Sequence, residues 1–265
     1  MTPDLLARLH ELPPVGLVDL MDRAAALHRV DRKYLVPVGV AAALVTALSP
    51  RHAVLTIDAR RHTTYRSTYL DTATLSSCRD HVQQRRRRWK ARSRLYVEDG
   101  LCRTEVKVRS ARGATLKVYA DSTPARYGRC GDHEVGFVHA TLADHGFAAP
   151  PVLAPTLEVR YQRATLADLA AGSRITLDTG VVGTDGGSRM LLDPAFVVVE
   201  TKGGPRPGVA DRILLAAGHR PQSFSKYVAT VSLLRSDLPS NDVRRLVGVA
   251  LHVESVTPHE ESHAS

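Results

Sequence analysis

The sequence has few cysteines, and their arrangement argues against a zinc site and against a set of disulfides. Cys78, Cys102 and Cys130 are an odd number and show no Cys-x-x-Cys spacing. Such a set favours free thiols in a reducing compartment. We therefore expect a cytoplasmic protein.

Long hydrophobic segments are also absent. The longest apolar run, Val38 to Leu48, falls short of the ~20 residues that a transmembrane helix needs. The amino terminus has no basic stretch followed by an apolar core, so it does not resemble a signal peptide. Together these absences predict a protein without a transmembrane segment.

Short catalytic motifs are missing as well. The sequence contains no Gly-x-x-x-x-Gly-Lys-Ser/Thr loop, no Gly-x-Ser-x-Gly elbow and no His-Glu-x-x-His pair. Its twelve histidines are scattered without a spaced partner set. P-loop, serine-hydrolase and zincin chemistry are therefore excluded.

What the sequence does have is an excess of positive charge. The formal net charge is +9 over 265 residues and the isoelectric point is about 9.8. This balance indicates an anionic partner such as nucleic acid, polyphosphate, a nucleotide or an acidic membrane surface. Arginine dominates the cations, and its planar guanidinium suits bidentate phosphate binding.

The densest part of this charge lies in a predicted β-hairpin at residues 85–109. Asp99-Gly100 between two alternating stretches is a strong hairpin signal. Because side chains alternate with period two, charged residues share one face and apolar residues the other. A solvated face and a ligand-binding face fit this hairpin equally well. The charged face carries Lys90, Arg92, Arg94 and Tyr96 on the first strand and Glu105, Lys107 and Arg109 on the second.

The rest of the chain predicts many strands with few helices. Without regular strand–helix–strand alternation, it favours an α+β fold with an antiparallel sheet or barrel. We expect one domain over residues 1–235, with a helical segment at 1–28 packed on it, and a mobile tail at 236–265. Strands are expected at 29–36, 54–57, 63–71, 114–120, 156–163, 174–182 and 196–202, and helices at 37–48, 75–84, 132–145, 207–217 and 225–234.

Charged residues recur at alternate positions on strand after strand. They either cover the outside of a sheet or point into a closed barrel that encloses a basic tunnel. The tunnel explains why acids and bases recur together, since cations bind phosphate oxygens and carboxylates hold a bridging metal.

Eight segments, taken in order, resemble the VTC (vacuolar transporter chaperone) domain, the polyphosphate polymerase module of the triphosphate tunnel metalloenzyme (CYTH-like) superfamily. The resemblance extends from Arg29 to Leu234. Each segment is short, but their order and spacing are specific. They are RVDRKYLV at 29–36, YRSTYLDT at 65–72, KARSRLY at 90–96, TEVKV at 104–108, YQRATL at 161–166, RITLDT at 174–179, VETK at 199–202 and FSKY at 224–227.

The resemblance implies a closed antiparallel barrel of roughly eight strands, with flanking and plugging helices. Inside it, the γ-phosphate of ATP would pass to a polyphosphate chain with the help of Mn²⁺ or Mg²⁺. Such chemistry needs charge neutralisation and in-line positioning more than a protein nucleophile. It implies Glu200 as metal ligand, Arg92, Arg94, Lys107, Tyr161, Arg163, Arg174 and Lys202 as catalytic residues, and Lys33, Arg109, Lys117, Ser225 and Lys226 as substrate-binding residues.

Alternatives remain at several points. A tripolyphosphatase or nucleoside triphosphatase of the same fold would use water instead, although hydrolytic members favour paired glutamates on the first strand and Asp31 is the only acid here. A non-catalytic module would bind polyphosphate, with nucleic acid the less favoured ligand. Glu200 can equally pair with neighbouring cations, and Ser225 can serve only as a helix cap.

On the strand expected at 156–163, alternation alone does not decide which charged residues point inward. Glu158 and Arg160 lie on the face opposite Tyr161 and Arg163, so period two cannot place both pairs inside without a bulge. The resemblance selects Tyr161 and Arg163.

Overall fold

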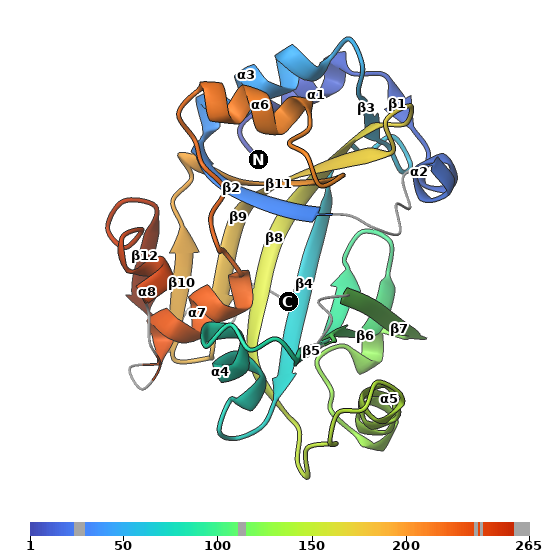
Figure 1. The fold of residues 1–265 in the computed structure, drawn as a ribbon, viewed down its shortest axis with the longest axis vertical. Helices are drawn as coiled ribbons and strands as arrows, with labels where there is room; N and C mark the ends of the chain where they lie inside the picture. Colours follow the sequence, from blue (N-terminus) through green and yellow to red (C-terminus); the bar gives the residue numbers. More distant parts are fainter. Residues whose placement is uncertain (24–29, 111–114, 236–237, 239–240, 257–265) are drawn as a thin grey trace.

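The computed structural model describes residues 1–23, 30–110, 115–235, 238 and 241–256. One twelve-stranded sheet runs through this part of the chain, with helices on both of its faces (Figure 1). The strands are β1 (Pro14–Val15), β2 (Val30–Pro37), β3 (Ala53–Leu55), β4 (Thr63–Asp71), β5 (Arg88–Tyr96), β6 (Leu101–Arg109), β7 (Thr115–Ser122), β8 (Ala154–Asp168), β9 (Ser173–Thr184), β10 (Ser188–Leu192), β11 (Phe196–Gly203) and β12 (Leu251–Ser255). The helices are α1 (Pro3–Glu11), α2 (Leu17–Arg23), α3 (Val38–Leu48), α4 (Ser76–Val82), α5 (Asp132–Asp144), α6 (Val209–Ala216), α7 (Lys226–Leu234) and α8 (Asn241–Arg244), with a short 3₁₀ turn at Pro124–Arg126.

The sheet is antiparallel along its main path, as predicted. Hydrogen bonds connect β2–β11–β9–β8–β4–β5–β6–β7 in that order, and β10 and β12 extend from β9. The expected closure of the barrel is not made: among the described strands no pairing joins β7 to β2. Charges from the two ends of the sheet interact across this space: burial lowers the pKa of Lys107 of β6, Asp31 of β2 raises it and Lys33 of β2 lowers it.

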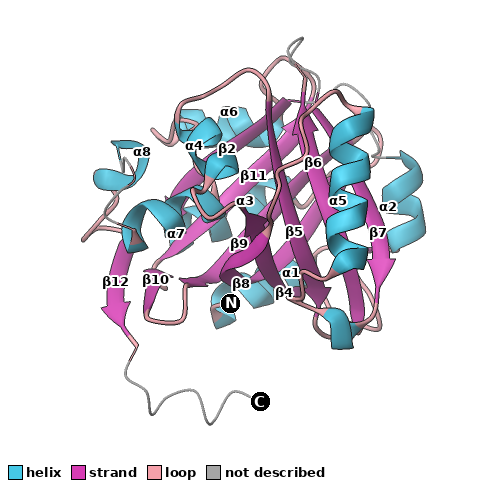
Figure 2. Cartoon of the chain, turned by 90° about the horizontal axis from the view of Figure 1, so that it is seen from below, coloured by secondary structure: helices cyan, strands magenta, loops and turns pink. Residues whose placement is uncertain are grey.

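The predicted hairpin is confirmed in its turn and in its faces. Gly100 has φ +58° at the turn, a conformation that a residue without a β-carbon adopts at no cost. Ala91 and Val106 point away from the charges and pack with Val138 and Leu142 of α5, which lies along the hairpin (Figure 2). Because α5 covers the apolar face, the charged face of the hairpin points to the inside of the curved sheet.

Two other groups of helices cover the remaining surfaces. α1, α3 and α6 pack on β2, β9 and β11 through a core that includes Leu5, Leu44 and Leu214. α7 packs on the other side, against β8 and β9, with Val159, Tyr227 and neighbouring residues in a second core. The plugging helix expected from the resemblance is therefore α7.

The contact between α7 and β9 is unusually close. A β-carbon on Gly183 would lie 2.1 Å from Oγ1 of Thr230, which is fully buried. The helix thus rests directly on the backbone of the strand.

The carboxyl-terminal region differs from expectation where it is described. Residues 241–256, expected in a mobile tail, form α8 and β12, and β12 pairs with β10 from Leu192↔Leu251 to Ser188↔Ser255. Leu251 is buried in the second core, which explains why the segment is ordered against the sheet. Residues 257–265, and residues 24–28 of the predicted amino-terminal segment, lie outside the described part. In that part no helix reaches the length and apolar character of a membrane span.

Candidate functional site

Cations from six strands and one helix converge on the inner face of the sheet. Against them stand four carboxylates: Asp31, Glu105, Asp178 and Glu200. This leaves a formal excess of positive charge in the interior, which is the requirement for holding a polyanion. The nine cations are Lys33 (β2), Lys90, Arg92 and Arg94 (β5), Lys107 (β6), Lys117 (β7), Arg163 (β8), Lys202 (β11) and Lys226 (α7).

Glu105 joins three of these cations on the hairpin side. Its carboxylate accepts hydrogen bonds from Nε of Arg92 at 2.7 Å and Nζ of Lys117 at 2.6 Å, with Nη1 of Arg94 at 3.7 Å. The side chain is 2% exposed. Although burial raises the pKa of Glu105, the three cations outweigh it and hold the pKa well below its usual range. Glu105 is therefore ionised and keeps the two arginines and Lys117 in place.

Asp178 of β9 has the same role beside β8. Arg163 donates to both of its oxygens, at 2.6 and 2.8 Å, and the ammonium of Lys226 donates to Oδ2. Burial works against ionisation, but Arg163 and Lys226 lower the pKa of Asp178 to about 2. The bidentate fork fixes the guanidinium plane of Arg163.

Glu200 lies among cations as well. Lys33 approaches Oε1 at 3.1 Å, while Lys202 and Arg163 approach Oε2 at 2.5 and 3.9 Å. Burial raises the pKa of Glu200, and the surrounding cations, Lys202 first, lower it well below its usual range. In the free protein the carboxylate thus pairs with cations, the alternative weighed for it above.

Tyr161 lies between the cluster around Glu105 and the cluster around Asp178. Its hydroxyl accepts a hydrogen bond from Nη2 of Arg94 at 3.0 Å, and Nζ of Lys226 lies 4.6 Å from its ring centroid. Tyr65 stacks on it with ring centroids 5.2 Å apart. Burial raises the pKa of Tyr161, but Arg94 and Arg163 more than offset this, so the net pKa is below its usual value. Tyr161 connects the hairpin cations to those of β8 and α7.

On β8, the residues that point inward are the two that the resemblance selects. The β8–β9 register shifts between Arg160 and Gln162, so that Tyr161 falls at the irregularity. Tyr161 and Arg163 point inward, whereas Glu158 bonds Arg66 at 3.0 and 3.1 Å on the outer face.

Ser225 caps α7 and also contacts a lysine of the hairpin, while its role in substrate binding stays a prediction. Its hydroxyl accepts from the backbone of Val228 at the start of α7, at 3.5 Å, and from Nζ of Lys90 at 2.9 Å. Lys90 is surrounded by protein, and this burial lowers its pKa well below the usual value. Lys107 is exposed and lies opposite Lys90 in the β5–β6 register, so the two lysines are neighbours on the inner face.

Two predicted residues lie at the ends of the site. Arg109 pairs across the hairpin with Arg88 and contributes to lowering the pKa of that arginine. The guanidinium of Arg174 donates to the carbonyl of Leu20 at 2.7 Å, next to α2. Arg174 shares the inward face with Lys202, but its contact with α2 places it beside the convergent group.

The structure adds four residues to those that the resemblance assigns to the site: Asp178, Glu105, Lys90 and Tyr65. Alternation alone places Lys90 and Glu105 on the charged face of the hairpin. Asp178 and Tyr65 meet partners on other strands, which the local pattern does not identify.

The donor set restricts how a divalent metal can bind. In the described part of the chain no three Asp, Glu, His or Cys side chains converge as ligands. Mg²⁺ is commonly held by one or two carboxylates together with substrate phosphates and water. Both oxygens of Glu200 are directed at cations that phosphate would attract. Glu200 therefore fits a site in which one carboxylate and substrate phosphates hold the metal, and does not fit a site made of protein ligands alone.

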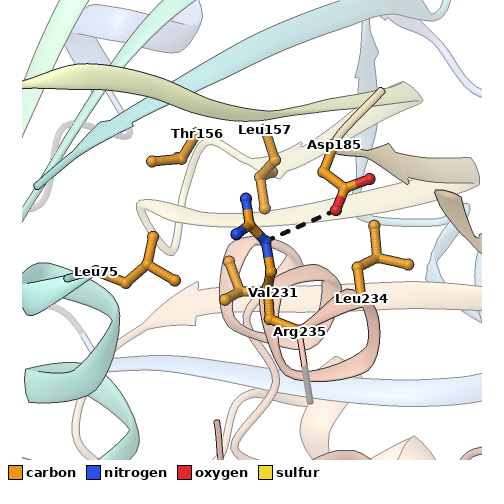
Figure 3. Close-up of a pocket in the computed structure, with 7 residues that line it drawn as sticks. All are labelled: Leu75, Thr156, Leu157, Asp185, Val231, Leu234 and Arg235. Atoms are coloured by element: carbon orange, nitrogen blue, oxygen red, sulfur yellow. Dashed lines mark ion pairs between the residues drawn. The ribbon is translucent and has the colours of Figure 1, made fainter. Parts of the chain in front are cut away.

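A pocket beside α7 is too small for a substrate. A pocket of about 10 Å³ lies between α7 and the sheet, lined by Leu75, Leu157, Val231 and the Asp185–Arg235 ion pair (Figure 3). That volume is about one water molecule.

A pH dependence follows from Lys117. Burial lowers its pKa to about 8, and Glu105 raises it only in part. Its charge is present below pH 8 and is lost as the pH rises through that value, so affinity for tripolyphosphate should fall between pH 7 and 9. We expect Lys117→Met to bind more weakly at pH 7 and to show a flatter profile by calorimetry. Parallel profiles for the two proteins would contradict this assignment.

Comparison with known proteins agrees with this arrangement. The pattern that defines the VTC domain matches residues 28–131 and 145–235. No curated protein matches the sequence. Among solved structures, a putative adenylate cyclase from Vibrio parahaemolyticus is 14% identical with a TM-score of 0.41, covering 76% of this chain and 96% of its own.

Two further structures are similar to the same degree. A putative adenylyl cyclase from Hippeastrum, described as having a dominant triphosphatase activity, is 16% identical with a TM-score of 0.44 and covers 77% of this chain and 96% of its own. A protein from Pyrococcus horikoshii is 13% identical with a TM-score of 0.39 and covers 79% and 99%. We draw no functional conclusion from likenesses this distant. The family match covers more than half of the sequence, and the chain therefore belongs to the VTC domain family.

Proposed function

We propose that this domain is a metal-dependent phosphotransferase of the polyphosphate polymerase type. It would transfer the γ-phosphate of ATP to the end of a polyphosphate chain within the basic interior. The observation that carries the proposal is the convergence of nine cations on one face of the sheet inside a VTC domain, seven of them in contact with buried carboxylates. Arginines and lysines in this arrangement neutralise phosphate oxygens in the ground state and in the transition state.

The cations form two groups that meet at Tyr161. One group, around Asp178 and Glu200, includes Arg163, Lys226, Lys33 and Lys202 and would hold the triphosphate. The other group, around Glu105, comprises Arg92, Arg94 and Lys117 and would hold the acceptor chain. Two neighbouring phosphate-binding groups would let a donor and an acceptor phosphate meet, as an in-line transfer requires.

The transfer is balanced without a protein nucleophile. A terminal oxygen of the acceptor chain forms a bond to the γ-phosphorus, and the bond from that phosphorus to the β–γ bridging oxygen breaks with its electrons going to ADP. Arg94 and Arg163 flank Tyr161, so they can neutralise the equatorial oxygens as charge redistributes. Their orientation is already fixed by Glu105 and Asp178, which lowers the reorganisation needed during the reaction.

Glu200 would hold the divalent cation together with the phosphates, and the bound ion would supply charge neutralisation at the phosphate oxygens. When phosphates enter, Lys33 and Lys202 can turn from Glu200 to phosphate oxygens, which frees the carboxylate. The same residues also suit a tripolyphosphatase, with water in place of the acceptor chain, or a binder without turnover.

Incubation with ATP and Mn²⁺ separates these activities. ADP together with long-chain phosphate supports the polymerase, whereas orthophosphate from ATP or tripolyphosphate supports the hydrolase. We expect Glu200→Gln to lose turnover by about 10²-fold or more while still binding tripolyphosphate in the absence of metal. Tight binding of polyphosphate with no turnover by the unmodified protein would refute the proposal.

A further inference from the structure

Tyrosine side chains gather on the inner face of the sheet near the turn of the hairpin. Tyr65 is the cross-strand partner of Tyr161 on one side and of Tyr96 on the other. Its ring stacks on that of Tyr161 at 5.2 Å and meets that of Tyr96 at 4.9 Å with a tilt of 57°. Tyr119 of β7 pairs with Glu105 in the register, so its ring lies on the same face. We name Tyr65, Tyr96 and Tyr119 the tyrosine strip.

Arg103 lies between two rings of the strip. Its guanidinium carbon is 4.2 Å from the ring centroid of Tyr119 and 6.0 Å from that of Tyr96. Nε of Arg103 donates a hydrogen bond to Asp121 at 2.7 Å, so a carboxylate already matches this positive charge. Tyr119 is 50% exposed, and much of its ring is therefore accessible. The strip offers flat π surfaces without the excess of cations that holds phosphates elsewhere on this face.

The strip begins next to the residues proposed to hold the reacting phosphates. The guanidinium carbons of Arg94 and Arg163 lie 5.2 and 5.5 Å from the ring centroid of Tyr65. Arg103 is also the cross-strand partner of Arg94. A molecule whose γ-phosphate lies between Arg94 and Arg163 can therefore extend along the same face of the sheet onto the strip.

The other end of the hairpin has a different chemistry on this face. There β5 and β6 pair Arg88 with Arg109, and Lys90 with Lys107. Tyr227, whose ring centroid lies 5.7 Å from Nζ of Lys90, is 1% exposed and offers no face to a ligand. This cationic end suits a chain made only of phosphates, whereas the end with the tyrosine strip suits a ligand that carries a flat ring.

We propose that the tyrosine strip binds the base and ribose of the nucleoside triphosphate, while the phosphates lie at Arg94, Arg163 and the residues around Asp178. The inference rests on the proposed function, because it presumes that the interior binds a nucleoside triphosphate. Stacking on tyrosine and arginine tolerates any base, so the strip selects nucleotides over inorganic chains and discriminates little among bases. Inorganic tripolyphosphate does not use it.

The test compares the binding of ATP and of inorganic tripolyphosphate by calorimetry, without divalent metal so that no turnover occurs. Tyr119→Ala removes the most accessible ring of the strip. Leu116→Ala is its matched control, because Leu116 is 46% exposed on the opposite face of the same strand. We expect Tyr119→Ala to weaken ATP binding about tenfold and to leave tripolyphosphate binding unchanged. Leu116→Ala should change neither affinity, and Tyr119→Phe, which keeps the ring, should bind ATP like the unmodified protein.

A fluorescence measurement keeps the test decisive if Tyr119→Ala does not fold. Tyr119→Trp keeps a ring at this position, and Trp89, the tryptophan already present, is 6% exposed. ATP should change the emission of the introduced ring, and tripolyphosphate should not. An equal response to both ligands, unchanged ATP binding by Tyr119→Ala, or an equal loss for both ligands would overturn the nucleoside assignment while leaving triphosphate binding intact. If the unmodified protein binds neither ligand, the proposed function itself fails.

Discussion

Replacement of Arg163 by methionine is expected to lower turnover by about 10³-fold, the largest effect of any single substitution in the interior. Arg163 contacts Asp178 through two hydrogen bonds, approaches Glu200 at 3.9 Å and lies 5.3 Å from the centroid of Tyr161. Arg163 thus reaches both carboxylates of the proposed triphosphate group. Single-turnover kinetics with ATP would measure the loss in the chemical step separately from binding.

The matched control is Arg66→Met. Arg66 lies on neighbouring β4 and also forms a two-point pair, with Glu158, but on the outer face. This variant should keep full turnover. Arg163→Lys distinguishes charge from geometry, since lysine keeps the charge and loses the fork. Equal turnover in the Arg163 and Arg66 methionine variants would show that the interior face is not where phosphate reacts.

Replacement of Glu105 by glutamine is expected to cost about 3–5 kcal/mol of the free energy of unfolding, because it leaves buried cations without their counter-charge. Arg92, Arg94 and Lys117 all direct donors at this 2%-exposed carboxylate. Tripolyphosphate should restore more stability to the variant than to the unmodified protein, since it supplies the missing negative charge. Urea unfolding with and without the ligand measures both effects.

Glu158→Gln is the control for this substitution. Glu158 also pairs with an arginine, but its side chain is 25% exposed, so its loss should cost about 0–1 kcal/mol. Ligand should stabilise the Glu158 variant and the unmodified protein equally. The prediction is contradicted if both substitutions lower the free energy of unfolding by a similar amount, or if tripolyphosphate stabilises the Glu105 variant no more than the unmodified protein. Either result would mean that a phosphate does not replace the negative charge of Glu105.

Local pattern was enough to predict many elements and which residues of the hairpin share a face. The strand at Thr63–Asp71 has the predicted bounds, and the helix at Val38–Leu48 begins one residue after the predicted start. Alternation placed Arg92 and Arg94 together, and α5 explains why that face turned inward: the apolar face needed a helix to cover it. Which way a charged face points is decided by what packs on its other side.

Partners across strands could not be read from the sequence. Asp178 meets Arg163 because β8 and β9 pair with a shifted register next to Tyr161, and such a shift depends on the whole sheet. β10 and β12 were missed because they are short and mutually dependent: each has weak periodicity and gains its order from the other.

The contact between Gly183 and Thr230 has a consequence for the reach of Lys226. Even a methyl group at position 183 would overlap the threonine side chain, with separations of 2.1–2.8 Å, so α7 could no longer rest where it does. Lys226 is the first residue of that helix, and its ammonium reaches Asp178 only from this seat. Gly183, which has no side chain to contact a ligand, therefore sets how deeply the lysine penetrates.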